Sequence, residues 1–170
     1  ETVDAQGLDL LGDGVVVRGG TATAVGPGNV ITGRVGVLAT APATIKGNLI
    51  GLNSDGSVIT SVSETSTGLP TQGWIGVWAH GPGVVVGGPG PQDRNVISGS
   101  GQPRGADWAR SDIGVRAGGV LVDGPGVIVQ GNLIGTNTNG TAARPSYHGI
   151  RTAEGSIGTE IRDNVISGNT

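Results

Sequence analysis

Short apolar segments follow one another along the chain in a fixed order and predict a repeated unit of three short strands. Each unit begins with Gly-(Val/Ile), continues through a middle apolar segment and finishes with Asn-(Val/Leu)-Ile, which glycine follows within two residues. The five units begin near residues 14, 36, 76, 119 and 149. These strands are too short to fold alone and their turns too tight for helical crossovers, so we expect them to wind around one shared core.

The middle segments supply the second strand of each unit. They lie at residues 24–25, 44–45, 84–86, 127–129 and 160–161. Their β-branched residues suit a pleated surface, and equivalent positions of successive units would stack at the ~4.8 Å spacing of paired strands. The predicted fold class is therefore all-β, a single-stranded parallel β-helix of five three-strand coils in which inward Val, Ile and Leu stack on their equivalents.

The asparagine that opens the third segment is the most regular polar position of the repeat. It occurs at Asn29, Asn48, Asn95, Asn132 and Asn164. Aligned coils would place all five at one corner, where each side-chain amide can hydrogen-bond the turn backbone and the asparagines above and below. We predict that these residues form a structural ladder.

Two kinds of unit alternate along the chain. Residues 47–57 read Gly-Asn-Leu-Ile-Gly-Leu-Asn-Ser-Asp-Gly-Ser, and residues 131–141 read Gly-Asn-Leu-Ile-Gly-Thr-Asn-Thr-Asn-Gly-Thr. The other three units carry Asn-Val-Ile-(Thr/Ser)-Gly instead. A two-coil alternation is therefore superimposed on the single-coil repeat.

Composition agrees with short strands joined by tight turns. The 170 residues include 35 Gly, 21 Val and 13 Ile, while Phe, Met and Cys are absent. Collagen is excluded because the glycines have no three-residue period, and a disordered linker is excluded because apolar clusters recur throughout. One domain over residues 1–170 accommodates the whole repeat.

The charge pattern argues against several classes of partner. The net charge is −3 with acids and bases scattered, which gives no basic face for nucleic acid and no polybasic patch for a membrane surface. The longest apolar runs are a few residues, so we expect no membrane span. The absence of Cys excludes disulfides and thiolate metal sites, and we expect no cofactor.

Two motifs resemble a known group of repeats. Gly-Asn-Leu-Ile-Gly-Thr at residues 131–136 and Asn-Val-Ile-Ser-Gly-Asn at residues 164–169 resemble the right-handed parallel β-helix repeats of large bacterial surface proteins, within the broader pectin-lyase-like group. The resemblance covers residues 14–168. It implies right-handed winding, which parallel crossovers also favour, and an extracellular or cell-surface location. It leaves the activity open, because such proteins include adhesins, fibres, and polysaccharide lyases and hydrolases.

Insertions fall at one place in the repeat, after the third segment of a coil. Loops are predicted over residues 51–75, 99–118 and 135–148, and coils in register would gather them into one ridge. Sugar rings stack on aromatic faces, so aromatic and cationic residues of this ridge are candidate contacts for a cell-surface glycan. These candidates are Trp74, Trp108, Arg104, Arg110 and Tyr147. Anchoring the loops to the barrel flank is the alternative role for the aromatic residues.

No set of residues indicates catalysis. Glycoside hydrolysis requires two carboxylates at a fixed separation, and Asp107 and Asp112 share one loop instead of equivalent positions in adjacent coils. A lyase resembling the pectin-active members needs several acids for Ca²⁺ and a basic proton acceptor, whereas the acids are dispersed and Lys46 is the one lysine. His80 and His148 lie two coils apart. We therefore predict no enzyme, with a polysaccharide lyase or hydrolase as the remaining alternative.

Two short segments echo the start of a Ca²⁺-binding loop. Asn53-Ser-Asp55-Gly and Asn137-Thr-Asn139-Gly place oxygen ligands on alternate residues before a glycine, but the distal acid that completes such a loop is missing. Asx turns, in which the side chain bonds its own backbone, explain these segments better. We predict no metal site.

A β-helix has unpaired strand edges at both ends, and little in this sequence would cover them. Residues 1–13 are expected to form a partial cap or a loop between units. Placing Thr170 before Glu1 brings the next asparagine 35 residues after Asn164, close to the internal spacings of 37 and 32. We hypothesise an extracellular structural unit that stacks end to end as a homo-oligomeric filament, or that belongs to a longer surface fibre. A carbohydrate-binding adhesin segment is the alternative.

Overall fold

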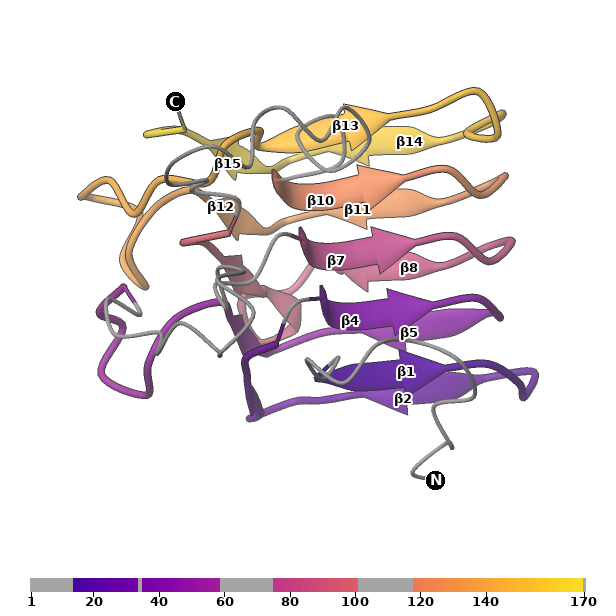
Figure 1. Ribbon diagram of the computed structural model, residues 1–170, viewed down its shortest axis with the longest axis horizontal. Coiled ribbons are helices and arrows are strands. Elements are labelled where there is room, and N and C mark those ends of the chain that lie inside the picture. Colours follow the sequence, from indigo (N-terminus) through magenta and orange to yellow (C-terminus); the bar gives the residue numbers. More distant parts are fainter. Residues whose placement is uncertain (1–13, 34, 59–74, 101–117, 170) are drawn as a thin grey trace, which may run out of the picture.

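The protein is a parallel β-helix of five coils, seen in a computed structural model that describes residues 14–33, 35–58, 75–100 and 118–169 (Figure 1). Fifteen short strands build three parallel sheets of five strands, and each coil contributes one strand to every sheet. Apart from a 3₁₀ turn at Pro91–Asp93, helix is absent from the described residues. The predicted all-β stack of coils is confirmed.

Sheets A, B and C hold the first, second and third strand of each coil. Sheet A contains β1 (Val15–Val17), β4 (Val35–Ala39), β7 (Ile75–Ala79), β10 (Gly118–Val122) and β13 (Ile150–Thr152). Sheet B contains β2 (Thr23–Val25), β5 (Ala43–Ile45), β8 (Val85–Gly87), β11 (Ile128–Gln130) and β14 (Glu160–Arg162). Sheet C contains β3 (Val30–Ile31), β6 (Leu49–Ile50), β9 (Val96–Ile97), β12 (Leu133–Ile134) and β15 (Val165–Ile166). We number the coils 1 to 5 in chain order.

Strand register places equivalent side chains above one another in the core. The inward column of sheet C is isoleucine in every coil, namely Ile31, Ile50, Ile97, Ile134 and Ile166. Neighbouring residues of each strand point outward, because successive side chains of a strand alternate between its two faces. A slip of one residue would exchange the isoleucine column for the outward Val and Leu residues, so the register decides which side chains fill the core.

The glycine that opens each coil allows this packing. A Cβ atom on Gly76 would lie 2.5 Å from Ile97 Cγ2 of its own coil and 2.6 Å from the carbonyl oxygen of Gly119 in the next coil. A Cβ at the equivalent Gly36 would meet Ile50 Cγ2 at 2.7 Å and the next coil at 2.5 Å. Glycine is therefore required where the isoleucine column and the neighbouring backbone approach this position.

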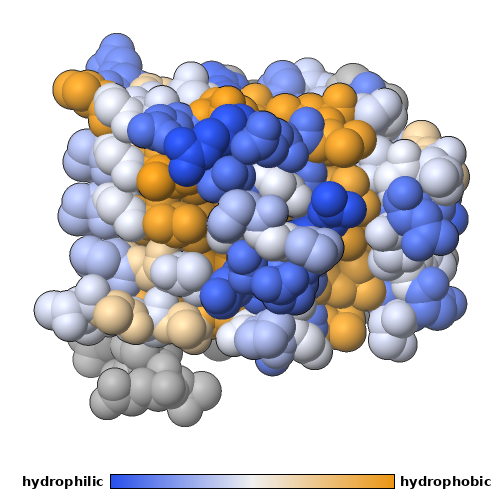
Figure 2. Space-filling view, turned by 180° about the vertical axis from the view of Figure 1, so that it is seen from behind, coloured by the Kyte–Doolittle hydropathy of each residue, from blue (hydrophilic) through white to orange (hydrophobic). Residues whose placement is uncertain are grey.

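Apolar residues also gather outside the barrel. On the outer face of sheet C, Val96 and Leu133 form a buried cluster with Leu52, and Leu49 and Val58 pack against it. Seen from behind, hydrophilic residues lie over the middle of the stack, with hydrophobic residues to both sides (Figure 2). This face is therefore divided into apolar and polar zones.

The long connections leave the stack at the corner between sheets C and A. Bridges between Leu52 and Val58, and between Thr136 and Ala143, each close a small hairpin in coils 2 and 4. The side chain of Arg144 donates from Nε to the Gly56 carbonyl oxygen at 3.4 Å, which joins the two hairpins. The described parts of the predicted loops thus lie together on one edge.

Candidate functional site

The five repeat asparagines form a hydrogen-bonded column, here called the asparagine row. The Nδ2 of each of the first four donates to Oδ1 of the asparagine in the next coil, at distances of 3.0, 3.1, 2.9 and 3.0 Å from coil 1 to coil 5. Asn48, Asn95 and Asn132 are buried. Their amides are satisfied by one another and by backbone, so burial of these polar groups carries little penalty.

The asparagine row has a direction. The backbone N–H of Asn95 donates to Asn132 Oδ1 at 3.2 Å, and that of Asn132 donates to Asn164 Oδ1 at 3.0 Å. Asn164 Nδ2 also donates back to the Val129 carbonyl oxygen of coil 4 at 2.8 Å. Among the described residues, Asn29 Oδ1 has no donor and the Asn164 N–H no acceptor. The row therefore ends in an acceptor at coil 1 and in donors at coil 5.

One end of the stack, here called the coil-5 face, is formed by the last coil (Figure 1). Its strands β13, β14 and β15 are edge strands of the three sheets. Ile161 and Ile166 are 44% and 46% exposed, although their partners one coil below, Val129 and Ile134, are fully buried. The apolar columns therefore continue to the surface of coil 5.

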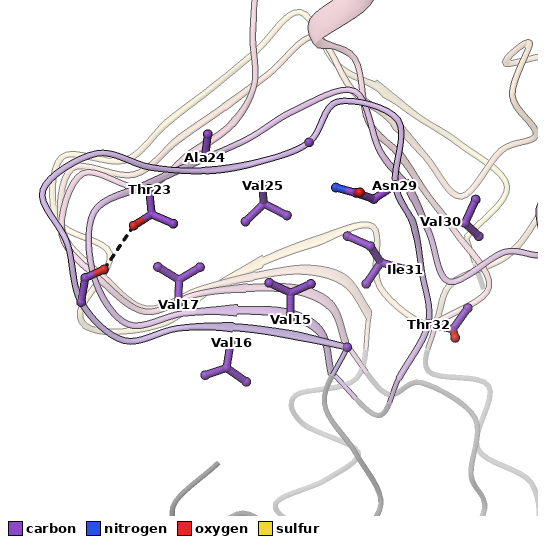
Figure 3. Close-up of a pocket in the computed structure, with 13 residues that line it drawn as sticks. Val15, Val16, Val17, Thr23, Ala24, Val25, Asn29, Val30, Ile31 and Thr32 are labelled. Atoms are coloured by element: carbon purple, nitrogen blue, oxygen red, sulfur yellow. Dashed lines mark hydrogen bonds between the residues drawn. The ribbon is translucent and has the colours of Figure 1, made fainter. Parts of the chain in front are cut away.

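The opposite end, here called the coil-1 face, contains a cavity of about 460 Å³. Val15, Val17, Val25 and Ile31 point into it, as does the side chain of Asn29 (Figure 3). The strands that carry these side chains, β1, β2 and β3, are the edge strands at this end of the sheets. The coil-1 face is thus the hollow end of the same apolar columns that emerge at coil 5.

One of the predicted glycan contacts is described. Tyr147 is half-buried, its N–H donates to the Ser100 carbonyl oxygen at 3.0 Å, and its ring centroid lies 4.5 Å from that of His148. This places Tyr147 beside the hairpin corner. The other candidate contacts and the two loop carboxylates lie outside the described residues: Trp74, Arg104, Trp108, Arg110, Asp107 and Asp112.

A polar and aromatic cluster joins coils 3 and 4, and no motif in the linear sequence marks it. Asp123 Oδ1 accepts from Trp78 Nε1 at 2.9 Å and lies 2.8 Å from His80 Nδ1. The partners are brought together because Ala79 pairs with Val122, which puts His80 and Asp123 in one column. Aligning the sequences of coils 3 and 4 would have placed His80 opposite Asp123 and so indicated this cluster.

The two segments that echo Ca²⁺ loops bond their own turns. Asp55 Oδ1 accepts from the Ser57 N–H at 2.9 Å, and Asn137 Oδ1 accepts from the Thr141 N–H at 2.8 Å. Hydrogen bonds from the side chain and backbone of Ser57 lower the pKa of Asp55 below its usual 3.8. Within the described ranges, no group of three or more His, Asp or Glu side chains is placed to hold a metal ion.

The three stacked parallel sheets define the class of protein, a parallel β-helix solenoid. In the part of the chain that the structure describes, no helix is long and apolar enough to cross a membrane. Comparison with models of protein families, with curated proteins and with solved structures gives no match. Inference about function therefore rests on the two faces and the row that runs between them.

Proposed function

We propose that this protein is a structural unit of an extracellular fibre, lengthened end to end by strand pairing at its two open faces. One observation carries the proposal: the apolar columns and strand edges reach both faces, and none of the described residues covers them. At coil 5, Ile161 and Ile166 stand 44% and 46% exposed, and at coil 1 a cavity of about 460 Å³ is lined by equivalent positions.

The chemistry of the coil-5 face supports this role. Proteins usually protect sheet edges with inward-pointing charges, proline, bulges or a covering element. The inward positions of β14 and β15 hold Ile161 and Ile166, and the charges of Glu160 and Arg162 lie on the outward side of the strand. Such an edge is a template for another strand. Covering it would bury the exposed 44% and 46% of Ile161 and Ile166, worth roughly half of the about 1.5–3 kcal/mol of a fully buried side chain in each case.

Sedimentation velocity and negative-stain electron microscopy of the purified chain over a concentration series test the proposal. We expect the sedimentation coefficient to rise with concentration. Rods of constant width should appear, with lengths in steps of about 24 Å for five coils at ~4.8 Å each. A single species of monomer mass at every concentration would show that the chain does not lengthen in this way.

A further inference from the structure

We propose that copies of this chain join head to tail, with the coil-5 face of one copy binding the coil-1 face of the next in one direction and one register. The partner is therefore a second copy of the same chain. This inference rests on the proposed function, and it adds a polarity that end-to-end lengthening alone does not require.

The asparagine row supplies matching donors and acceptors across the junction. Within the chain, a backbone N–H and an Nδ2 of one coil donate to the next asparagine Oδ1, as Asn48 does to Asn95 at 3.0 and 3.1 Å. Repeating this step places the N–H and Nδ2 of Asn164 against Asn29 Oδ1 of the next copy. These donors and this acceptor lie at the two faces. The junction would therefore repeat the hydrogen-bond arrangement found between successive coils within the chain.

The side-chain amide of Asn29 in the next copy would also have a hydrogen-bond acceptor across the junction. Asn48 Nδ2 donates to the carbonyl oxygen of Val25 in the preceding coil at 2.9 Å, and Asn132 Nδ2 donates to that of Val86 at 2.9 Å. Across the junction, the same rule directs Asn29 Nδ2 to the carbonyl oxygen of Ile161. The row would thereby continue unbroken from one copy to the next.

The backbone ladders of sheets B and C continue in the same register. In sheet C, the Val165 N–H donates to Asn132 O and the Ser167 N–H to Ile134 O, both toward the preceding coil. Equivalent bonds would join Val30 and Thr32 to the carbonyl oxygens of Asn164 and Ile166. In sheet B, where the Lys46 N–H donates to the Val25 carbonyl oxygen, the equivalent bond would join the Gly26 N–H to the carbonyl oxygen of Ile161.

Both kinds of coil use these ladder bonds. The Gly51 N–H of coil 2 donates to Ile31 O at 2.9 Å, and the Ser98 N–H of coil 3 donates to Ile50 O at 3.0 Å. Glycine and serine at this position thus make the same bond to the coil before. The two-coil alternation therefore does not prevent coil 1, with Thr32 at this position, from following coil 5.

The apolar columns match as well. Head-to-tail contact places Ile31 above Ile166 in the isoleucine column and Val25 above Ile161 in sheet B. A two-fold contact between like faces would pair the strands antiparallel and would set two acceptor ends, or two donor ends, of the asparagine row against each other. The heterologous arrangement is thus favoured, and it does not close on itself.

Two variants that each block one face distinguish the arrangements. Ile166→Lys puts an inward charge on the coil-5 face, and Val15→Lys does the same on the coil-1 face, which should weaken that contact at least about 100-fold. Each variant alone should sediment as a monomer where the unmodified chain forms rods. An equimolar mixture should give a dimer, because the intact coil-5 face of the Val15→Lys copy binds the intact coil-1 face of the Ile166→Lys copy. The dimer should grow no further, because both of its remaining faces are blocked.

The controls keep the test decisive. Val165→Lys introduces the same charge beside Ile166 at a position of similar exposure, 44% against 46%, but on the outer side of β15, and it should form rods like the unmodified chain. Circular dichroism reports folding, and Ile161→Lys with Thr23→Lys provides a second blocked pair. Two results would overturn the head-to-tail arrangement and leave end-to-end association standing. One is a blocked variant that dimerises by itself, and the other is a folded mixture that stays monomeric while the unmodified chain forms rods. Absence of rods from the unmodified chain would overturn the proposed function as well.

Discussion

At the scale of single residues, Asn95 shows how a fully buried amide is accommodated. It has no exposed surface, accepts hydrogen bonds from Asn48, and donates to Asn132 Oδ1 at 2.9 Å and to the Ile45 carbonyl oxygen at 2.8 Å. Its bonds thus hold three coils in register. The sequence shows that an asparagine recurs here, and the register explains why: Nδ2 makes two donor bonds, which the single hydroxyl of serine could not make, and the glutamine amide would lie one carbon further from the backbone.

We expect Asn95→Ala to lower the free energy of unfolding by about 3 kcal/mol, because the buried Asn48 N–H loses its acceptor and a small cavity forms. Asn29→Ala, at the exposed coil-1 end, should cost less than about 1 kcal/mol. Urea unfolding measures both, in an Ile166→Lys background that keeps the protein monomeric. Equal losses for the two variants would show that position in the row is irrelevant.

The opening glycine gives a second residue-scale prediction. Gly76→Ala should destabilise the fold by at least about 3 kcal/mol, since its Cβ would lie 2.5 Å from Ile97 Cγ2 and 2.6 Å from a backbone oxygen. Gly83 has φ +62°, and a Cβ added there would meet nothing within 4 Å, so Gly83→Ala should cost about 1 kcal/mol. Thermal unfolding of the two variants compares steric exclusion with backbone strain, and similar losses would contradict the packing explanation.

At the scale of elements, the strands were predictable and several contacts between loops were not. Gly-(Val/Ile) and Asn-(Val/Leu)-Ile located the strands of sheets A and C because one short period repeats in the core. The contact between Arg144 and Gly56 joins residues 88 positions apart in two hairpins, with coil 3 between them. Asp123 meets Trp78 and His80 only once Ala79 and Val122 are paired. These contacts follow from stacking, which a local pattern does not contain.

The coil-2 hairpin carries a pH-dependent element. Because Ser57 hydrogen-bonds the ionised carboxylate of Asp55, the folded pKa lies below 3.8. A depressed acid pKa stabilises the hairpin above the unfolded pKa, and that stabilisation is lost as pH falls through the folded pKa. We expect a carboxyl ¹³C titration of Asp55 to show the low pKa and Ser57→Ala to raise it. If the pKa of Asp55 is the same in Ser57→Ala, the Ser57 side chain is not what lowers it.

At the scale of the whole molecule, end-to-end association of copies should slow hydrogen exchange of backbone amides at the two faces and leave exchange in the interior coils unchanged. In β14 the Glu160 N–H bonds coil 4, so the Ile161 N–H, next along the strand, points toward the open edge. Hydrogen exchange at Ile161 and Ile166 should slow as concentration rises, while Val86 and Ile97 exchange at a constant slow rate. Concentration-independent exchange at Ile161 would show that its edge finds no partner.

The direction of the hydrogen bonds has a mechanical consequence. The strands run across the stack and their ladders run along it, so a pull between the two ends loads these bonds in series, one coil after another. Coils should therefore peel away in turn at low force, releasing lengths set by the spacing of the row, 19, 47, 37 and 32 residues. In single-molecule stretching, the protein should lengthen in unequal steps and act as an extensible tether, whereas one abrupt rupture would show that the coils fail together.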